Sequence, residues 1–165
     1  MQAHVQTSLL PFCRHLQMTS WATAIRTSIW MYPFIQLIHF SGLSLWLGTN
    51  VAGDLRLLGA GKKIQTAADV RDELFAWNWL GFCVAIFGGF LLFSARATMY
   101  IINPAFRTKL FVLIPTALLW HIIVQAKTRE WGKSTETPLV AKLSGLLELL
   151  LWISVVTAAV EIPSY

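Results

Sequence analysis

Three ionisable side chains stand within long apolar stretches of the sequence, where a charge is costly. They are His39, His121 and Glu148. Ionisable groups at membrane depth usually face the interior of a helix bundle and mark functional sites. Two neutral imidazoles on different helices are able to hold a haem b iron from opposite sides. We therefore expect His39 and His121 to ligate a haem iron and to form the cofactor-binding site.

Further polar residues extend this hypothesis. Haem propionates need a cation at the membrane interface, which we expect to be Arg96, with Lys109 as the alternative. Glu148 and His121 are predicted to reach the same depth from opposite directions, so that they form a hydrogen bond. Such a pair serves as a proton relay, as one wall of a quinone pocket together with Gln125, or as a purely structural contact. These alternatives stay open beside haem ligation.

The elements that position these residues follow from the distribution of charge. Three windows lack Asp, Glu, Lys and Arg, and a fourth contains only Glu148: 27–53, 74–95, 110–126 and 143–160. Each is close to the roughly 20 apolar residues that a helix needs to cross a bilayer. The sequence therefore predicts an all-α integral membrane four-helix bundle. Its helices are expected at about 29–52, 75–101, 106–127 and 139–162.

Composition supports this class. The chain has 165 residues, of which 56% are hydrophobic and 13% charged, whereas a soluble domain carries roughly 25% charged residues. The 13 Lys and Arg residues are scattered through short connections, which excludes a phosphate-binding surface for nucleic acid. The expected environment is the lipid bilayer. No CxxCH motif is present, so covalent haem attachment is excluded.

The first residues differ from the rest of the chain. We expect 1–28 to form an interfacial amphipathic segment and 29–165 to form the membrane domain. Apolar residues recur in this segment at helical spacing: Leu9, Phe12, Cys13 and Leu16. Thr19 or Ser20 is expected to cap a second short helix.

Basic residues indicate the topology. The connections after the first and third predicted helices hold eight Lys and Arg residues, Lys62 among them, and the opposite side holds five. By the positive-inside rule, both termini are predicted to lie in the periplasm of a bacterial inner membrane. Asp54 and Arg56 are expected to end the first helix at the inner surface, and the alternating charges over 62–73 to form a solvated connection.

Small residues predict one close contact. Gly81, Ala85 and Gly89 recur every four residues, with Gly88 beside them. Such a stripe permits close approach of another helix, and a flat cofactor is the sharper alternative. Asn103 and Pro104 are expected to form the break between the second and third helices.

Two segments carry a resemblance: YPFIQLIHFSGLSLWLGTNVAGDLRLLG (32–59) and INPAFRTKL (102–110). They resemble a family of small uncharacterised bacterial four-helix inner-membrane proteins, distantly similar to copper-resistance-D-like and cytochrome-b-like membrane domains. In the cytochrome-b-like relatives, histidines in different helices ligate haem b. The resemblance places these ligands on His39 and His121, and so implies at most one haem.

Three functions follow from these observations. The first is a haem-b-binding electron-transfer protein or redox subunit that acts between the quinone pool and a partner. The alternative is a non-catalytic structural or accessory subunit of a larger membrane complex, and both imply a membrane-protein partner more than a stand-alone enzyme. A copper transporter is disfavoured, since two Cys and four Met residues form no thioether ladder.

Overall fold

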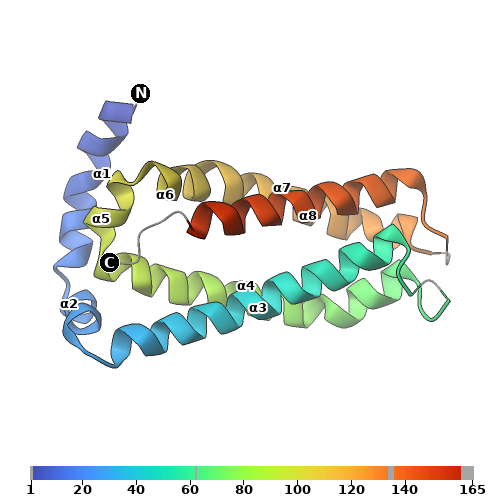
Figure 1. The fold of residues 1–165 in the computed structure, drawn as a ribbon, viewed down its shortest axis with the longest axis horizontal. Coiled ribbons are helices and arrows are strands. Elements are labelled where there is room, and N and C mark those ends of the chain that lie inside the picture. Colours follow the sequence, from blue (N-terminus) through green and yellow to red (C-terminus); the bar gives the residue numbers. More distant parts are fainter. Residues whose placement is uncertain (1, 62, 134–135, 161–165) are drawn as a thin grey trace.

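The structure is a computed structural model that describes residues 2–61, 63–133 and 136–160, with side chains from residue 9 onward. Every described element is helical, which confirms the all-α prediction (Figure 1). The elements are α1 (Gln2–Gln17), α2 (Ser20–Thr27), α3 (Met31–Leu58), α4 (Ala67–Ala95), α5 (Ala97–Ile102), α6 (Pro104–Thr108), the π-helical turn η1 (Lys109–Leu113), α7 (Ile114–Trp131) and α8 (Leu139–Val160).

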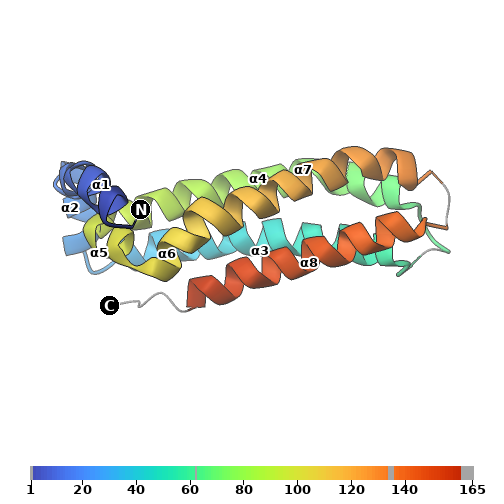
Figure 2. The same cartoon turned by 90° about the horizontal axis from the view of Figure 1, so that it is seen from above.

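Four long helices run side by side along the molecule, namely α3, α4, α7 and α8 (Figures 1 and 2). The largest packing contact joins α3 to α4, and α8 packs against both α3 and α7. The short helices α1 and α2 lie across one end, beside α5, and we call this the cap end. The opposite end, where α3 connects to α4 and α7 to α8, is called the loop end.

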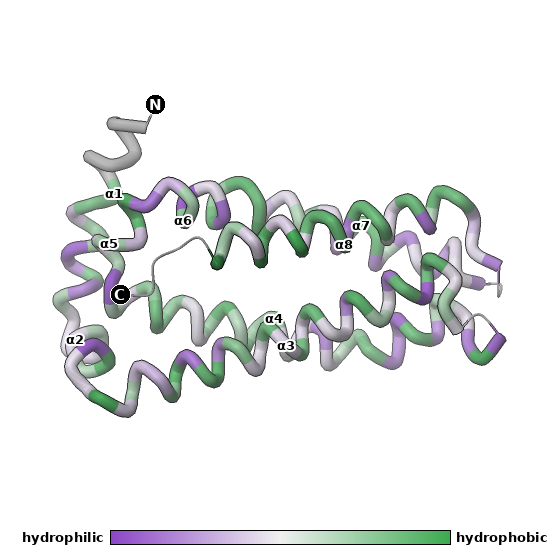
Figure 3. Tube along the Cα trace, viewed as in Figure 1, coloured by the Kyte–Doolittle hydropathy of each residue, from purple (hydrophilic) through white to green (hydrophobic). Residues whose placement is uncertain are grey.

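Three helices are long and apolar enough to cross a membrane: Ala67–Ala95, Pro104–Trp131 and Leu139–Val160. The chain is therefore described as a membrane protein. Helix α3 is not among the three because polar residues such as Gln36, His39 and Asn50 interrupt its apolar sequence. Figure 3 shows hydrophobic residues along all four long helices and hydrophilic stretches at both ends of the bundle.

The predicted end of the first helix was wrong. Helix α3 continues six residues beyond the expected position and ends at Gly59, which has a positive φ of 111° that favours glycine. Asp54 and Arg56 therefore lie inside the helix, and both are buried. Asn50, Asp54 and Leu57 recur at helical spacing and are all buried, so the inward face of α3 continues past the point where the charges suggested a stop.

The predicted solvated connection over 62–73 was also wrong from Ala67 onward. Thr66 and Asp69 form a capping box, in which the Thr66 hydroxyl accepts the Asp69 N–H and the Asp69 carboxylate accepts the Thr66 N–H. Helix α4 therefore begins eight residues before the expected 75, and Arg71 lies inside it. Lys62 lies outside the described residues.

The second half of the chain is more divided than expected. The predicted helix 75–101 breaks at Arg96, and the predicted helix 106–127 is divided among α6, η1 and α7. Pro115 has no N–H and its ring crowds the carbonyl four residues earlier, which explains the widened π-helical turn before it. The expected break at Asn103 and Pro104 is confirmed, because the Asn103 side chain caps α6. The last two residues of the predicted helix 139–162 lie outside the described residues.

The stripe of small residues on α4 faces α3. A Cβ atom added at Gly81 would lie 2.6 Å from the backbone nitrogen of Trp46, and one at Gly42 would lie 2.5 Å from that of Ala85. Gly88 would meet the Cβ of His39 at 2.9 Å. The two backbones approach so closely that another helix, rather than a flat cofactor, occupies this groove.

The amphipathic N-terminal segment packs on the protein. Cys13 is buried against Ala97 and Ile101 of α5, so the side of α1 that was expected to face the membrane contacts α5 instead. Phe12, by contrast, is 60% exposed. The expected cap is confirmed at Thr19, whose side chain accepts the N–H of Ala22 at the start of α2.

Candidate functional site

Polar side chains from all four long helices meet inside the loop-end half of the molecule. We call this set the buried polar chain; its members are Asp54, Arg71, Glu148, His121, Asn78, Asn50 and Thr49. Each is less than one-tenth exposed, and three of them, Asp54, His121 and Glu148, are fully buried. The sequence folds this way because the members of α3 recur on one helix face, at positions 49, 50 and 54, towards α4 and α8.

Ion pairs form the part of the buried polar chain that lies nearest the loop end. Arg71 Nη2 lies 2.7 Å from Asp54 Oδ1 and 3.5 Å from Glu148 Oε2. Gly53 makes room for this arginine, since a Cβ atom there would lie 2.7 Å from Arg71 Nε. One guanidinium thus faces two carboxyl groups, away from water.

His121 lies in the part of the buried polar chain that is further from the loop end. Its Nδ1 lies 2.5 Å from Glu148 Oε1, and its Nε2 lies 3.1 Å from Asn78 Oδ1. The predicted contact between His121 and Glu148 is therefore present. Both ring nitrogens are engaged by side chains of other helices, which fixes the orientation of the imidazole.

The proton positions follow from the hydrogen-bond partners. The Thr49 hydroxyl is within 2.9 Å of the Leu45 and Trp46 carbonyls, which only accept, so it donates there and accepts from Asn78 Nδ2. The oxygen of the Asn78 amide then faces His121 and accepts a hydrogen bond, so Nε2 carries the hydrogen. The contact between Nδ1 and Glu148 also needs one proton, held either by the imidazole or by the carboxyl group.

The net charge of the buried polar chain also indicates one proton. Two carboxylates, one guanidinium and a neutral imidazole carry a net charge of −1, which is costly in a buried site. One added proton makes the group neutral. The charge count and the hydrogen bonds thus both favour one proton in the contact between Glu148 and His121.

An aromatic layer covers the buried polar chain on the side of the cap end. The Trp46 ring centroid lies 4.8 Å from that of His121, and Trp152 and Phe82 pack on Trp46 at 5.4 and 4.7 Å. Gln125 lies beside this layer, because its side-chain oxygen accepts the indole N–H of Trp79 at 3.2 Å. Gln125 is not brought to Glu148, with which it was grouped as a proton or quinone site.

The structure does not bring His39 and His121 together. His39 is half-buried, its Nδ1 donates to the Ala85 carbonyl at 2.7 Å, and its ring lies against Gly89 of α4. His121 packs instead on Trp46, which lies seven residues further along α3, or about 10 Å at 1.5 Å per residue. Ligation of one iron by both histidines, which we expected, does not fit this arrangement, and haem binding stays a prediction.

The cations expected for haem propionates contact aromatic rings. The guanidinium carbon of Arg96 lies 5.2 Å from the Tyr32 ring centroid, and Lys109 Nζ lies 5.5 Å from that of Phe106. The hydroxyls of Tyr32 and Tyr100 lie 3.1 Å apart. Burial, followed by this hydrogen bond, raises the pKa of Tyr100 above its usual value. Arg96 is thus part of an aromatic cluster at the cap end.

Sequence reasoning missed Asp54, Arg71 and Asn78 as site residues. Asp54 follows Asn50 by four residues, which places both on one helix face, and this spacing was a usable signal. The pattern T-x-x-D at Thr66 was the signal for an early helix start that would have placed Arg71 inside α4. Nothing in the sequence indicated Asn78 as a site residue, because a single amide in an apolar helix does not show which neighbouring helix it contacts.

Comparison with known proteins defines the family but not its activity. The chain belongs to a family of unknown function (DUF6644), whose model matches residues 19–163. The match begins after α1 and includes every member of the buried polar chain. No curated protein and no solved structure matches the chain.

Proposed function

We propose that this protein binds and releases protons within the membrane through the pair formed by His121 and Glu148. The observation that carries the proposal is the geometry of His121, whose Nδ1 lies 2.5 Å from Glu148 Oε1 and whose Nε2 lies 3.1 Å from Asn78 Oδ1. Both groups are fully buried. An imidazole beside a carboxyl group is a suitable proton carrier, because a small change in surroundings moves the proton between them.

The loop end is the proposed side of proton exchange. Arg71 lies one turn inside α4 and Asn78 seven residues deeper, so the buried polar chain extends about 10 Å along the bundle. Asp54 Oδ2 and Glu148 Oε2 are buried oxygens without a hydrogen-bond partner among the described residues. A proton that enters from the loop end meets these oxygens first, and the aromatic layer stops it on the other side.

The membrane arrangement is part of the proposal. We infer that α3 is a fourth span, since it packs along α4 over its length and its polar residues at 49, 50 and 54 face the interior. The excess of basic residues at the loop end favours a bacterial inner membrane with both termini in the periplasm. Protons would then be exchanged with the cytoplasm, and a membrane-protein partner would use the change in charge.

Infrared difference spectroscopy of the protein in lipid bilayers tests this function. Between a low and a high pH, and beyond the bands of the exposed carboxyl groups, we expect a protonated-carboxyl or imidazolium band that shifts in D₂O and is absent from Glu148→Gln. Glu130→Gln is the matched control, because its carboxylate is exposed at the end of α7. A band that persists in Glu148→Gln, or the lack of any pH-dependent band, would contradict proton binding and favour an accessory structural subunit.

Haem b binding is the second candidate, and one observation favours it. His39 donates from Nδ1 to a backbone carbonyl, which leaves Nε2 with the lone pair that a metal requires. The electron-transfer function between quinone and a partner rests on this residue. A dithionite-reduced minus oxidised spectrum of the purified protein tests it: a haem b spectrum that is lost in His39→Ala would support it, and a flat spectrum would remove it.

A further inference from the structure

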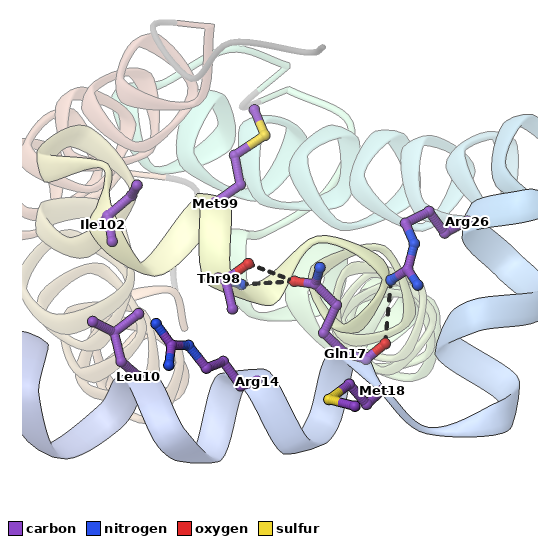
Figure 4. A pocket seen from close by; sticks show the side chains of 8 residues that line it. All are labelled: Leu10, Arg14, Gln17, Met18, Arg26, Thr98, Met99 and Ile102. Carbon is purple, nitrogen blue, oxygen red and sulfur yellow. Dashed lines mark hydrogen bonds between the residues drawn. The ribbon is translucent and has the colours of Figure 1, made fainter.

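A groove at the cap end lies apart from the buried polar chain. It encloses about 660 Å³ between α1, α2 and α5 and is open to the surface (Figure 4). Leu10, Met99 and Ile102 give it apolar walls, and Arg14 and Arg26 supply two guanidinium groups. An apolar groove with cations fits a ligand that has an anionic head and a hydrocarbon part.

The polar groups of the groove differ in whether they already form hydrogen bonds within the protein. Arg26 is fixed, because it donates to the carbonyl oxygens of Gln17 and Ala95, each at 3.2 Å. Gln17 is fixed as well, since its side-chain oxygen accepts from the backbone N–H and the hydroxyl of Thr98 at 3.0 and 2.7 Å. Arg14 forms no hydrogen bond or ion pair within the described part of the chain, so its donors are available to a ligand.

Helices α1, α2, α5 and α6 contain no acidic residue that offsets these cations. The sequence contains no Asp or Glu before Asp54, nor any between Glu73 and Glu130. Helices α1, α2 and α6 therefore present only basic charges, among them Arg107, and Arg96 adds another between α4 and α5. These cations attract anions over a distance of about one Debye length.

The position of the groove identifies the source of the anion. Helices α1 and α2 lie across the end of the membrane-spanning helices (Figure 1), which is the level of lipid headgroups. Trp30 and Met18 at this end are about four-fifths exposed, and exposed tryptophan is typical of the membrane interface. A phospholipid is thus the anionic molecule that reaches the groove with both a phosphate and an acyl chain.

We propose that this groove binds the headgroup of an anionic phospholipid. The Arg14 guanidinium donates to the phosphate, with Arg26 adding charge from the opposite wall, because the planar guanidinium matches two phosphate oxygens at once. The acyl chain lies along Leu10, Met99 and Ile102. The site does not depend on the proposed proton function.

Native mass spectrometry of the protein, released from nanodiscs with equal amounts of phosphatidylglycerol and phosphatidylcholine, tests this site. We expect the wild type to retain phosphatidylglycerol selectively. Arg14→Gln is expected to lower that selectivity about fivefold, which is the contribution of one arginine near a membrane surface. Arg107→Gln, on α6 outside the groove, is the matched control and is expected to change it less than twofold.

Further arms separate the alternatives. Arg14→Lys keeps the charge without the planar donor pair, so an intermediate selectivity is expected. Competition with inorganic phosphate tests a free-anion site, because displacement of the lipid at millimolar phosphate would overturn the lipid assignment. Equal selectivity in wild type and Arg14→Gln would overturn the site itself. Since Arg14 makes no internal hydrogen bond, its replacement is expected to leave the melting temperature unchanged, which the same samples verify.

Discussion

The two halves of the bundle handle polar residues differently. Towards the loop end, Asp54, His121 and Glu148 are fully buried and pair with one another across helices. Towards the cap end, the last turns of α8 are open: Ser154 and Thr157 are exposed and donate to carbonyls of their own helix. The loop-end half therefore buries side chains that pair across helices. At the cap end of α8, by contrast, the hydroxyls donate only to carbonyls of α8 itself.

This difference separates polar groups that have only a structural role from polar groups that could bind or release a proton. A hydroxyl that donates to the carbonyl four residues back has used its one donor and needs no partner in another helix. A buried imidazole with two partners is different, because removal of any member leaves a charge or a donor unpaired. The comparison locates the candidate chemistry in the loop-end half and makes the same substitution predict different effects in the two halves.

The largest effect is expected from Glu148→Ala. This change leaves Arg71 and His121 without one partner each inside the protein, which costs about 3–5 kcal/mol of unfolding free energy. Glu130→Ala, whose carboxylate is 63% exposed, is expected to change it by less than about 0.5 kcal/mol. Equilibrium unfolding in mixed micelles measures both, and similar losses would contradict the contrast between the closed interior and the exposed surface of the loop-end half.

Gly53→Ala tests the fit of Arg71 in the same half. The added methyl group would lie 2.7 Å from Arg71 Nε, so the guanidinium must move away from Asp54 at a cost of about 1–3 kcal/mol. Gly48→Ala, one and a half turns earlier in α3, meets no atom within 4 Å. It is expected to be neutral or stabilising by up to about 1 kcal/mol. Thermal unfolding of the two variants measures the difference, and a neutral Gly53→Ala would show that Arg71 is not held in place.

His39→Gln is expected to have a smaller effect than His121→Gln. His39 is half-buried and forms one hydrogen bond, so its loss costs about 0.5–1.5 kcal/mol. The same change at His121 removes two partners in a fully buried site. A His39 variant that unfolds as readily as the His121 variant would mean that the cap-end half is as tightly coupled as the loop-end half.

The smallest effect is expected from Asp72→Asn. Its carboxylate pairs with Arg129 at 3.0 Å, but the side chains are 56% and 69% exposed. Exposed ion pairs contribute about 0–1 kcal/mol. Unfolding at low and high salt measures this pair, and a loss above about 1.5 kcal/mol would show that the loop end is more ordered than its exposure implies.

The sequence predicted the long helices but not their ends. Long uncharged windows located the apolar segments, because lipid excludes charge over a whole helix length. Charges near an end were misleading, since Asp54 and Arg71 interrupt the apolar pattern yet neutralise each other inside the bundle. Capping chemistry at Thr66 and the glycine at Gly59 decide where these helices begin and end, and both outweigh the charge pattern.

The candidate site was predictable in one contact only. His121 and Glu148 were matched by depth along antiparallel helices, which depends on the rise per residue. Depth alone says nothing of the side of a helix on which a neighbour lies, and so it wrongly grouped His39 with His121. The glycines at Gly42 and Gly81 fix the crossing of α3 and α4 and place Trp46, instead of His39, against His121.

The most direct test of the central claim is solid-state NMR of the protein in bilayers with ¹⁵N-labelled histidine, assigned with His39→Gln and His121→Gln. The account predicts opposite protonation in the two halves: His121 carries a proton on Nε2, bonded to Asn78, and His39 carries one on Nδ1, bonded to Ala85. Lowering the pH should change the Nδ1 signal of His121 while Nε2 stays protonated. An unprotonated Nε2 in His121 would contradict the hydrogen-bond order on which the shared proton rests.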